Sequence, residues 1–394
     1  MKKSLVAAAV AGVFAAPAAM ADVTISGAIN LGIELVKSSE DKQGLGITSL
    51  SRNQLNANYS NINIGSTDDI GNGNKVIFNY QLVVNPSQAT PGGNPFNRNS
   101  YLGIAGTWGA FKMGTNENVY ERFMYQADPL DGALGPGGNL MILGTPGAGT
   151  AFDTGHAACG VAGPGLGCIG FYRRTDQTIW YESPNWSGFT FEVDYTLSAF
   201  KTNGPPSSDP RVISIGGKWQ PEGMPFYIDL AYEKHDDFGA LNALNAALGT
   251  STSDDAIQVG GGYMIGDLGL HARYEQLSYE VTGNATAGDV TQLERDAFWF
   301  GVKYNLPSGY VGAELGIADE WDVTVNGGGT APDTGAKMFG IGYFHNLSKQ
   351  SQLQFIYGRT DNDSAGTYTQ AAAPNGGAPG SDHQVLHVGI KHTF

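Results

Sequence analysis

Charged side chains are scarce in this chain of 394 residues, because Asp, Glu, Lys and Arg together make up only 15 % of it. An average soluble domain has about a quarter. No apolar run is long enough to cross a membrane as a helix, which needs about 20 consecutive apolar residues. The histidines show no metal-ligand spacing, and no Gly-x-Ser-x-Gly elbow is present. These absences argue against an ordinary soluble domain, a helical membrane protein, a metal site and a Ser-His-Asp hydrolase.

The N-terminal segment has the pattern of a secretory signal peptide. Lys2 and Lys3 precede an apolar run over 5–16, and Ala19-Met20-Ala21 supplies small residues around one large one. This pattern predicts cleavage after Ala21, so that 1–21 is a signal peptide and 22–394 is the mature chain. The signal peptide predicts an exported protein. The protein is also acidic, since the full chain carries a formal net charge of −15.

The last eleven residues alternate strictly between apolar and polar side chains. Leu386, Val388, Ile390 and Phe394 share one face of an extended chain, and Lys391 and Thr393 lie on the other. Side chains alternate across a β-strand, so this segment is a strand with one apolar and one polar face. A strand that runs to a final aromatic residue is typical of a bacterial outer-membrane barrel, whose last strand pairs with its first.

The same alternation recurs along the whole chain and predicts sixteen strands. They are expected at 22–36, 53–66, 74–84, 97–106, 109–115, 175–183, 188–198, 211–219, 224–234, 255–265, 268–280, 295–306, 309–318, 336–346, 351–360 and 384–394. Short turns alternate with long polar connections, as in a membrane barrel with periplasmic turns and extracellular loops. We therefore predict an all-β fold, a transmembrane antiparallel barrel of one domain. A secreted β-sandwich with glycine-rich loops is the alternative.

Several segments make the chain similar to the general diffusion porins of Gram-negative outer membranes. They are 22–30 (DVTISGAIN), 64–73 (IGSTDDIGNG), 97–104 (NRNSYLGI), 109–114 (GAFKMG), 174–189 and the terminal 389–394 (GIKHTF). The resemblance spans the mature chain. It implies a sixteen-stranded, trimeric barrel whose long third loop folds into the lumen.

The resemblance also implies where the functional residues lie. In this family, carboxylates on the third loop face a ladder of arginines across the narrowest point of the pore. The segment 116–173 stands in the position of that loop. Its acidic candidates are Asp128, Asp131, Glu117 and Glu121, and the basic candidates on the wall are Arg98, Arg174 and Arg52.

The basic ladder is thinner here than in the family pattern. Asn61 and Thr115 stand where further basic residues are expected. Arg52 fits only with a bulge before Ile62, because the alternation along the first half of this strand conflicts with that of the second half. With the acidic balance of the chain, the thinned ladder predicts a modest preference for cations.

Each candidate has a simpler alternative. Arg98 and Arg174 could be wall residues without an effect on transport, and the Asp-Pro and Asp-Gly pairs at Asp128 and Asp131 also favour plain turns. Cys159 and Cys168 lie in the same loop of an exported protein, so a disulfide is favoured over metal binding or catalysis.

The sequence thus predicts an outer-membrane porin, a water-filled channel for passive diffusion of small hydrophilic solutes and ions, and not an enzyme. A substrate-selective channel with a binding site in the lumen, or a structural or adhesive barrel, is the alternative. No cofactor is expected, apart from surface Ca²⁺ at acidic loops. The expected partners are two further copies in a homotrimer, outer-membrane lipid and lipopolysaccharide, with no nucleic acid. Phe394 is expected to close the barrel.

Overall fold

The computed structural model describes most of the chain beyond its first 21 residues. The described residues are 22–58, 60–87, 98–130, 136–146, 170–199, 201, 203, 209–237, 252–281, 290–325, 333–370 and 378–394. The predicted signal peptide therefore lies outside the described residues. Among the described residues, no helix combines the length and the hydropathy needed to span a membrane.

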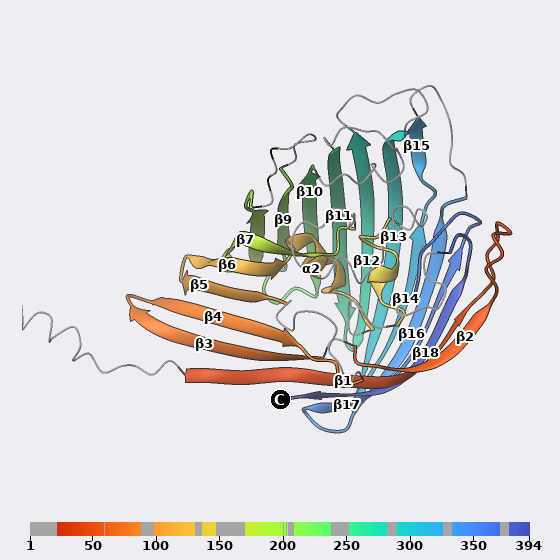
Figure 1. The fold of residues 1–394 in the computed structure, drawn as a ribbon. Coiled ribbons are helices and arrows are strands. Elements are labelled where there is room, and N and C mark those ends of the chain that lie inside the picture. The colour runs from red at the N-terminus through yellow and green to blue at the C-terminus, as the bar shows by residue number, and fades with distance from the viewer. Residues whose placement is uncertain are drawn as a thin grey trace, which may run out of the picture.

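The strands form one antiparallel sheet that closes on itself (Figure 1). Strand β1 (Asp22–Ser38) pairs with β18 (His383–Thr393) from Ala28↔Thr393 to Ser38↔His383. Beyond that register, Gly27 and Phe394 exchange backbone hydrogen bonds of 3.0 and 3.1 Å. The last strand therefore completes the ring with the first, as the terminal alternation predicts.

The remaining strands follow in chain order around the wall. They are β2 (Leu50–Asn56), β3 (Asn61–Gly71), β4 (Asn74–Val83), β5 (Ser100–Gly106), β6 (Gly109–Glu117), β7 (Arg174–Glu182), β8 (Phe189–Thr196), β9 (Arg211–Trp219), β10 (Phe226–Asp236), β11 (Thr252–Ile265), β12 (Leu268–Val281), β13 (Val290–Leu306), β14 (Gly309–Ala318), β15 (Asp322–Val325), β16 (Ala336–Asn346) and β17 (Ser351–Asn362). Two helical segments, α2 (Val119–Tyr125) and the 3₁₀ turn η1 (Asn139–Met141), lie between β6 and β7.

Two wall strands are interrupted, which reconciles these eighteen segments with the predicted sixteen strands. β2 and β3 both pair with β1, one along each half of it, and β14 and β15 both pair with β13. Counting each interrupted pair as one strand gives a closed sixteen-stranded barrel. The prediction of an all-β, sixteen-stranded barrel is confirmed.

The break between β2 and β3 contains the bulge that the alternation requires. On β1, the residues opposite Asn56 and Asn61 are Gly32 and Ala28, so five steps on one strand face four on the other. The extra residue changes which side chains face inward: even-numbered residues do so on β2 and odd-numbered residues on β3. As a result Arg52, opposite the buried Val36, lies on the inner face of the barrel.

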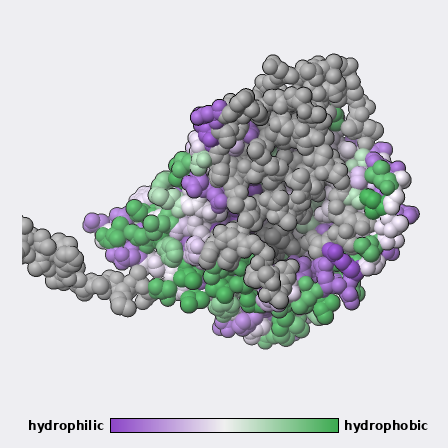
Figure 2. Space-filling view, viewed as in Figure 1, coloured by the Kyte–Doolittle hydropathy of each residue, from purple (hydrophilic) through white to green (hydrophobic). Residues whose placement is uncertain are grey.

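Alternation sorts the side chains of the wall into an apolar outside and a polar inside. On β1, Ile33 and Leu35 are 60 % and 53 % exposed on the outer face, whereas Glu34 between them is buried on the inner face. Figure 2 shows hydrophobic side chains grouped on the outer surface around the position of β1 in Figure 1. Such a band of exposed apolar residues is expected of a surface that faces lipid.

Connections are short at one end of the barrel and long at the other. The β3–β4 turn is tight because Gly71, Asn72 and Gly73 all adopt positive φ, which glycine and asparagine accept readily. The β11–β12 and β13–β14 turns at the same end have only two residues between strands. Since outer-membrane barrels have short periplasmic turns, this end is the periplasmic one.

Candidate functional site

The segment between β6 and β7 folds into the barrel and packs against its inner wall. We call its described parts, 118–130, 136–146 and 170–173, the inward loop. Figure 1 shows α2 inside the curve of the wall, and α2 contacts β8, β9 and β10. Val119, Tyr120, Phe123 and Met124 are at most 2 % exposed. Burying four large apolar side chains anchors the loop by the hydrophobic effect.

Polar side chains of the wall hold the start of α2. Asp194 accepts a hydrogen bond of 2.9 Å from the backbone N–H of Val119, and Ser214 accepts one of 2.9 Å from Tyr120. Gln258 donates to the carbonyl of Tyr120 at 2.7 Å. The first N–H groups of a helix have no partner within the helix. The wall therefore supplies partners that the loop cannot provide for itself.

A buried carboxylate, Glu275 on β12, joins two distant parts of the inward loop. It accepts hydrogen bonds from the Tyr120 hydroxyl at 3.0 Å and from the backbone N–H of Gly144 at 2.7 Å. Arg295 on β13 forms an ion pair with it, and both side chains are fully buried. A buried charge needs such partners, because removal from water is otherwise very costly.

Arg295 extends this clamp to the second half of the loop and to another loop. It donates to the carbonyls of Ile142 at 3.0 Å and Thr145 at 2.8 Å. It also donates to the hydroxyl of Tyr368, in the connection between β17 and β18, at 2.7 Å. One guanidinium thus links the wall, the inward loop and the last external connection, using the several donors that arginine offers.

Glycines on the inner wall make room for the inward loop. A Cβ at Gly216 would lie 2.8 Å from Val119, one at Gly312 would lie 2.4 Å from the carbonyl of Pro129, and one at Gly340 would lie 2.5 Å from Leu130. Ordinary carbon contacts are about 3.5–4.0 Å. The loop can lie this close to the wall only because these positions lack a side chain.

We expect Gly216→Val to push α2 away from the wall and into the lumen. The adjacent Gly217 is a matched control, because its Cβ would face outward and meet nothing closer than 3.5 Å. Gly216→Val should lower the single-channel conductance in planar bilayers, whereas Gly217→Val should leave it unchanged. Equal conductance in both variants would show that contact at Gly216 does not set the position of α2.

The structure brings Arg174 and Glu117 together at the start of the inward loop. They form an ion pair in which both side chains are less than 10 % exposed, and Tyr125 also donates to Glu117. Arg98 belongs to the same electrostatic cluster and is 9 % exposed. These predicted basic and acidic residues are therefore neighbours on one side of the barrel, and the ion pair offsets part of their charge.

Glu121 lies on α2 within this cluster and is 2 % exposed. Burial, with the nearby negative charge of Glu117, raises the pKa of Glu121 to about 8, although Arg174 and Arg98 act in the opposite direction. Near neutral pH this carboxyl is therefore largely protonated.

Asp128 turns its carboxylate toward the backbone of its own loop. It accepts hydrogen bonds from the N–H groups of Leu130 at 2.7 Å and Asn139 at 3.0 Å. This is the turn chemistry expected of an Asp-Pro pair. Asp131, Cys159 and Cys168 lie outside the described residues, and their proposed roles stay predictions.

Two groups of inner-wall residues could not be assigned from the sequence. The first comprises wall carboxylates at most 3 % exposed, namely Asp194, Glu233, Asp254, Glu275 and Glu314. The second comprises lysines with partly or well exposed side chains near the periplasmic end, namely Lys75, Lys112, Lys218, Lys303 and Lys391. Alternation could have placed both groups on the inner face. It could not have shown which of the two groups the inward loop covers.

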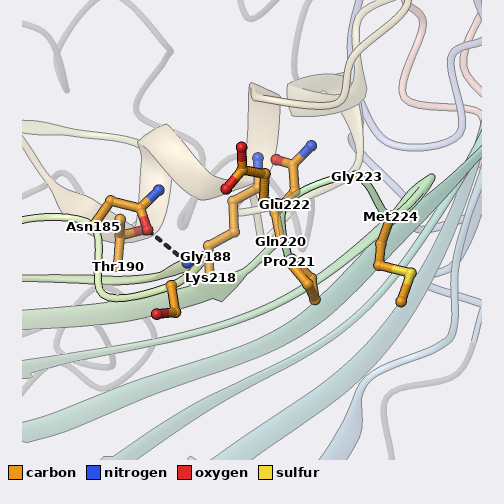
Figure 3. A pocket seen from close by; sticks show the side chains of 10 residues that line it. Asn185, Gly188, Thr190, Lys218, Gln220, Pro221, Glu222, Gly223 and Met224 are labelled. Atoms are coloured by element: carbon orange, nitrogen blue, oxygen red, sulfur yellow. Dashed lines mark hydrogen bonds between the residues drawn. The ribbon is translucent and has the colours of Figure 1, made fainter.

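A pocket of about 640 Å³ opens at the periplasmic end, between the β7–β8 and β9–β10 turns (Figure 3). Lys218 and Glu222 both line it, so its charge is mixed. Asn185 closes one turn by accepting a hydrogen bond of 2.6 Å from the N–H of Gly188. Within the described part of the chain, no group of three His, Cys, Asp or Glu side chains could hold a metal ion.

A closed barrel with a lipid-facing exterior, a polar interior and an inward-folded loop defines an outer-membrane channel protein. A sequence profile described as Gram-negative porin matches residues 6–365. The chain belongs to this family. It lies in the outer membrane and forms a channel for passive diffusion of small hydrophilic solutes. The family is one of channels rather than of enzymes.

Relatives over the full length agree with this assignment. Outer membrane porin protein 32 of Delftia acidovorans is 24 % identical, and the match covers 100 % of both chains. An outer membrane porin protein of Bordetella pertussis is 24 % identical over 91 % of this chain and 94 % of its own. Among solved structures, the anion-selective porin from Comamonas acidovorans has a TM-score of 0.73 and 22 % identity, covering 95 % of this chain and 100 % of that one.

Proposed function

We propose that this porin is a passive channel that prefers small anions and catalyses no reaction. The observation that carries the proposal is the unequal accessibility of charges on the inner wall. The inward loop lies over the wall carboxylates: Asp194 accepts from its backbone, and Glu275 is bound by Tyr120, Gly144 and Arg295. Of the lysines near the periplasmic end, Lys112 pairs with Glu182 at 2.6 Å, whereas Lys75, Lys218, Lys303 and Lys391 stay at least partly exposed.

Accessibility decides which charges a passing ion meets. An ion in the lumen can approach a water-exposed ammonium closely, whereas the buried wall carboxylates act through a layer of protein. Glu275 in addition lies beside its own cationic partner, Arg295. Lys75 is exposed and Lys218, Lys303 and Lys391 are partly exposed, all on the inner face. Arg52, which the bulge turns inward, adds a further positive side chain.

This proposal is opposite to the cation preference predicted from net charge. Part of the acidic charge of the chain belongs to residues at the external end, such as Asp319, Glu320 and Asp322. Potentials from such rim charges are screened over about 10 Å at 0.1 M salt. The lysines, in contrast, border the conducting path itself. The name of the Comamonas porin agrees with anion preference, but at 22 % identity that likeness supports the fold alone.

The test is the reversal potential across a KCl gradient. We expect chloride to be preferred, and we expect Lys75→Gln with Lys218→Gln to reduce that preference. Lys337→Gln is the control, because Lys337 is exposed on the outer face, beside Phe339 in the alternation of β16. A potassium preference in the unmodified channel would overturn the proposal and favour the acidic mouth as the selective element.

We further propose that the channel is a homotrimer. The support is the family assignment together with β1, whose outward Val23 and Ile25 are 67 % and 66 % exposed in the single chain. Apolar side chains that project this far are suited to contact with a neighbouring copy as well as with lipid. The loop 85–96, which resembles the latching loop of the family, lies mostly outside the described residues.

We expect three chains when the mass of unheated, detergent-extracted protein is measured. Heating in the same detergent should convert that species to single chains, because the contacts between barrels are weaker than the closed ladder of each barrel. A stable single chain that carries full conductance before heating would contradict the trimer.

A further inference from the structure

Three amide side chains gather around one buried carboxylate on the inner wall. Gln54 and Asn56 lie on β2, and Asn58 follows in the break before β3, where both strands run along β1 (Figure 1). We call these three residues the amide cluster. Their side-chain nitrogens donate to Glu34 of β1 at 2.8, 3.0 and 3.1 Å. Glu34 is fully buried, whereas the three amides are partly exposed, so the amides lie between the carboxylate and the water of the lumen.

The last strand closes the other side of Glu34. His387 on β18 stands opposite Glu34 in the register, and its Nδ1 lies 3.3 Å from a carboxylate oxygen. The ring of His387 lies over Gly32, where an added Cβ would be 2.1 Å from a ring carbon. Glu34 is thus in contact with four polar side chains and is shielded from water. A solute in the lumen therefore meets the amides first and does not touch the charge.

The carboxylate also fixes the orientation of the amide cluster. An ionised carboxylate only accepts hydrogen bonds, so each amide must turn its nitrogen toward Glu34 and its oxygen away from it. Within the described part of the chain, no group donates to the side-chain oxygens of Gln54, Asn56 and Asn58. Each such oxygen can accept two hydrogen bonds, and an amide nitrogen that gives one hydrogen to a carboxylate keeps a second one. The cluster therefore offers fixed acceptors together with donors, and carries no exposed charge of its own.

The amide cluster lies away from the part of the wall against which the inward loop packs. Helix α2 contacts β8, β9 and β10, and Pro129 and Leu130 of the loop lie over β14 and β16. The amide surface continues on the inner face of β3, where Asn63 donates to Asn61 at 2.9 Å. A solute that passes beside the inward loop therefore moves along a wall of neutral hydrogen-bonding groups.

We propose that the amide cluster is a binding site for neutral polyhydroxylated solutes such as small sugars. A hydroxyl group both donates and accepts, so adjacent hydroxyls of one sugar can bind adjacent amides at once. The positive charge of Arg52, two residues before Gln54 on the same face, disfavours a cation there, and the charge of Glu34 disfavours an anion. The proposal rests on the passive channel proposed above but does not depend on its anion preference.

The probe is glucose, and the matched solute is triethylene glycol, which has a similar mass but fewer hydroxyl donors. In planar bilayers, we expect glucose to lower the single-channel KCl conductance more than triethylene glycol does, after correction for the conductivity of the bulk solution. This excess should saturate with concentration, because it reports the occupancy of a site. In the double variant Asn56→Ala with Asn58→Ala, the apparent affinity for glucose should be roughly tenfold weaker, the effect of about two lost hydrogen bonds.

The control variant is Asn305→Ala with Asn346→Ala, which removes two exposed amides from the inner face at the periplasmic end, outside the amide cluster. Its affinity for glucose should equal that of the unmodified channel. If the loss of two donors to Glu34 prevents folding, the further change Glu34→Gln removes the charge that they satisfied, and the same tenfold loss is expected in that triple variant.

Equal effects of glucose and triethylene glycol on the unmodified channel, or equal loss in both double variants, would overturn the amide cluster as a site. The reversal potential separates this proposal from the anion preference, because glucose is uncharged. Chloride preference without a saturable glucose effect contradicts only the site. A saturable glucose effect in a potassium-preferring channel contradicts only the proposed selectivity.

Discussion

Replacing Arg295 with methionine is expected to release the inward loop from the wall and to admit larger solutes. The variant loses the bonds to Ile142, Thr145 and Tyr368 and leaves Glu275 buried without its cationic partner. Removing one member of a buried ion pair costs about 3–5 kcal/mol. Because the strands that carry these residues are held by the closed backbone ladder, the loss falls mainly on the docking of the loop.

Liposome swelling with sugars of increasing size measures this effect, and single-channel noise gives a second readout. The control is Arg359→Met, since Arg359 pairs with Asp361 while both side chains are more than 40 % exposed. Exposed pairs contribute at most about 1 kcal/mol, so its size limit should not move. The double variant Arg295→Met with Glu275→Met should recover part of the docking, because it removes the buried charge. An unchanged size limit in Arg295→Met would refute the clamp.

Deleting Phe394 is expected to lower the amount of folded barrel in the outer membrane. Phe394 exchanges two backbone hydrogen bonds with Gly27, and its ring lies over that glycine, where an added Cβ would be 3.1 Å from the ring, so it forms the periplasmic end of the seam between first and last strands. An open seam exposes unpaired backbone groups to lipid, where each costs several kcal/mol. The heat-modifiable form on gels measures the folded fraction. Phe394→Tyr keeps the backbone and an aromatic ring and should fold normally. Equal folded yields for the deletion and the unmodified chain would contradict this role.

The sequence by itself determined the wall of the barrel. Two-residue alternation is a local property, and each strand must place apolar side chains toward lipid whatever its neighbours are. This rule located all sixteen strands, with end shifts such as β5 beginning at Ser100 rather than 97 and β13 extending back to Val290. It also required the bulge before Ile62. In an unbroken strand Arg52 and Ile64 would face the same side, although one is charged and the other faces lipid.

Only the tertiary structure decided how the lumen is charged. The sequence shows that Glu275 and Lys303 both face inward, but it does not show that the inward loop covers the first and leaves the second in contact with water. The path of that loop depends on contacts between residues far apart in the chain, such as Tyr120 with Glu275 and Leu130 with the wall at Gly340. Such contacts leave no periodic pattern in the sequence. A charged side chain that is exposed in the lumen can interact with a passing solute, whereas a buried one forms ion pairs and hydrogen bonds within the protein. Burial depends on the assembled barrel and therefore cannot be obtained from the local sequence.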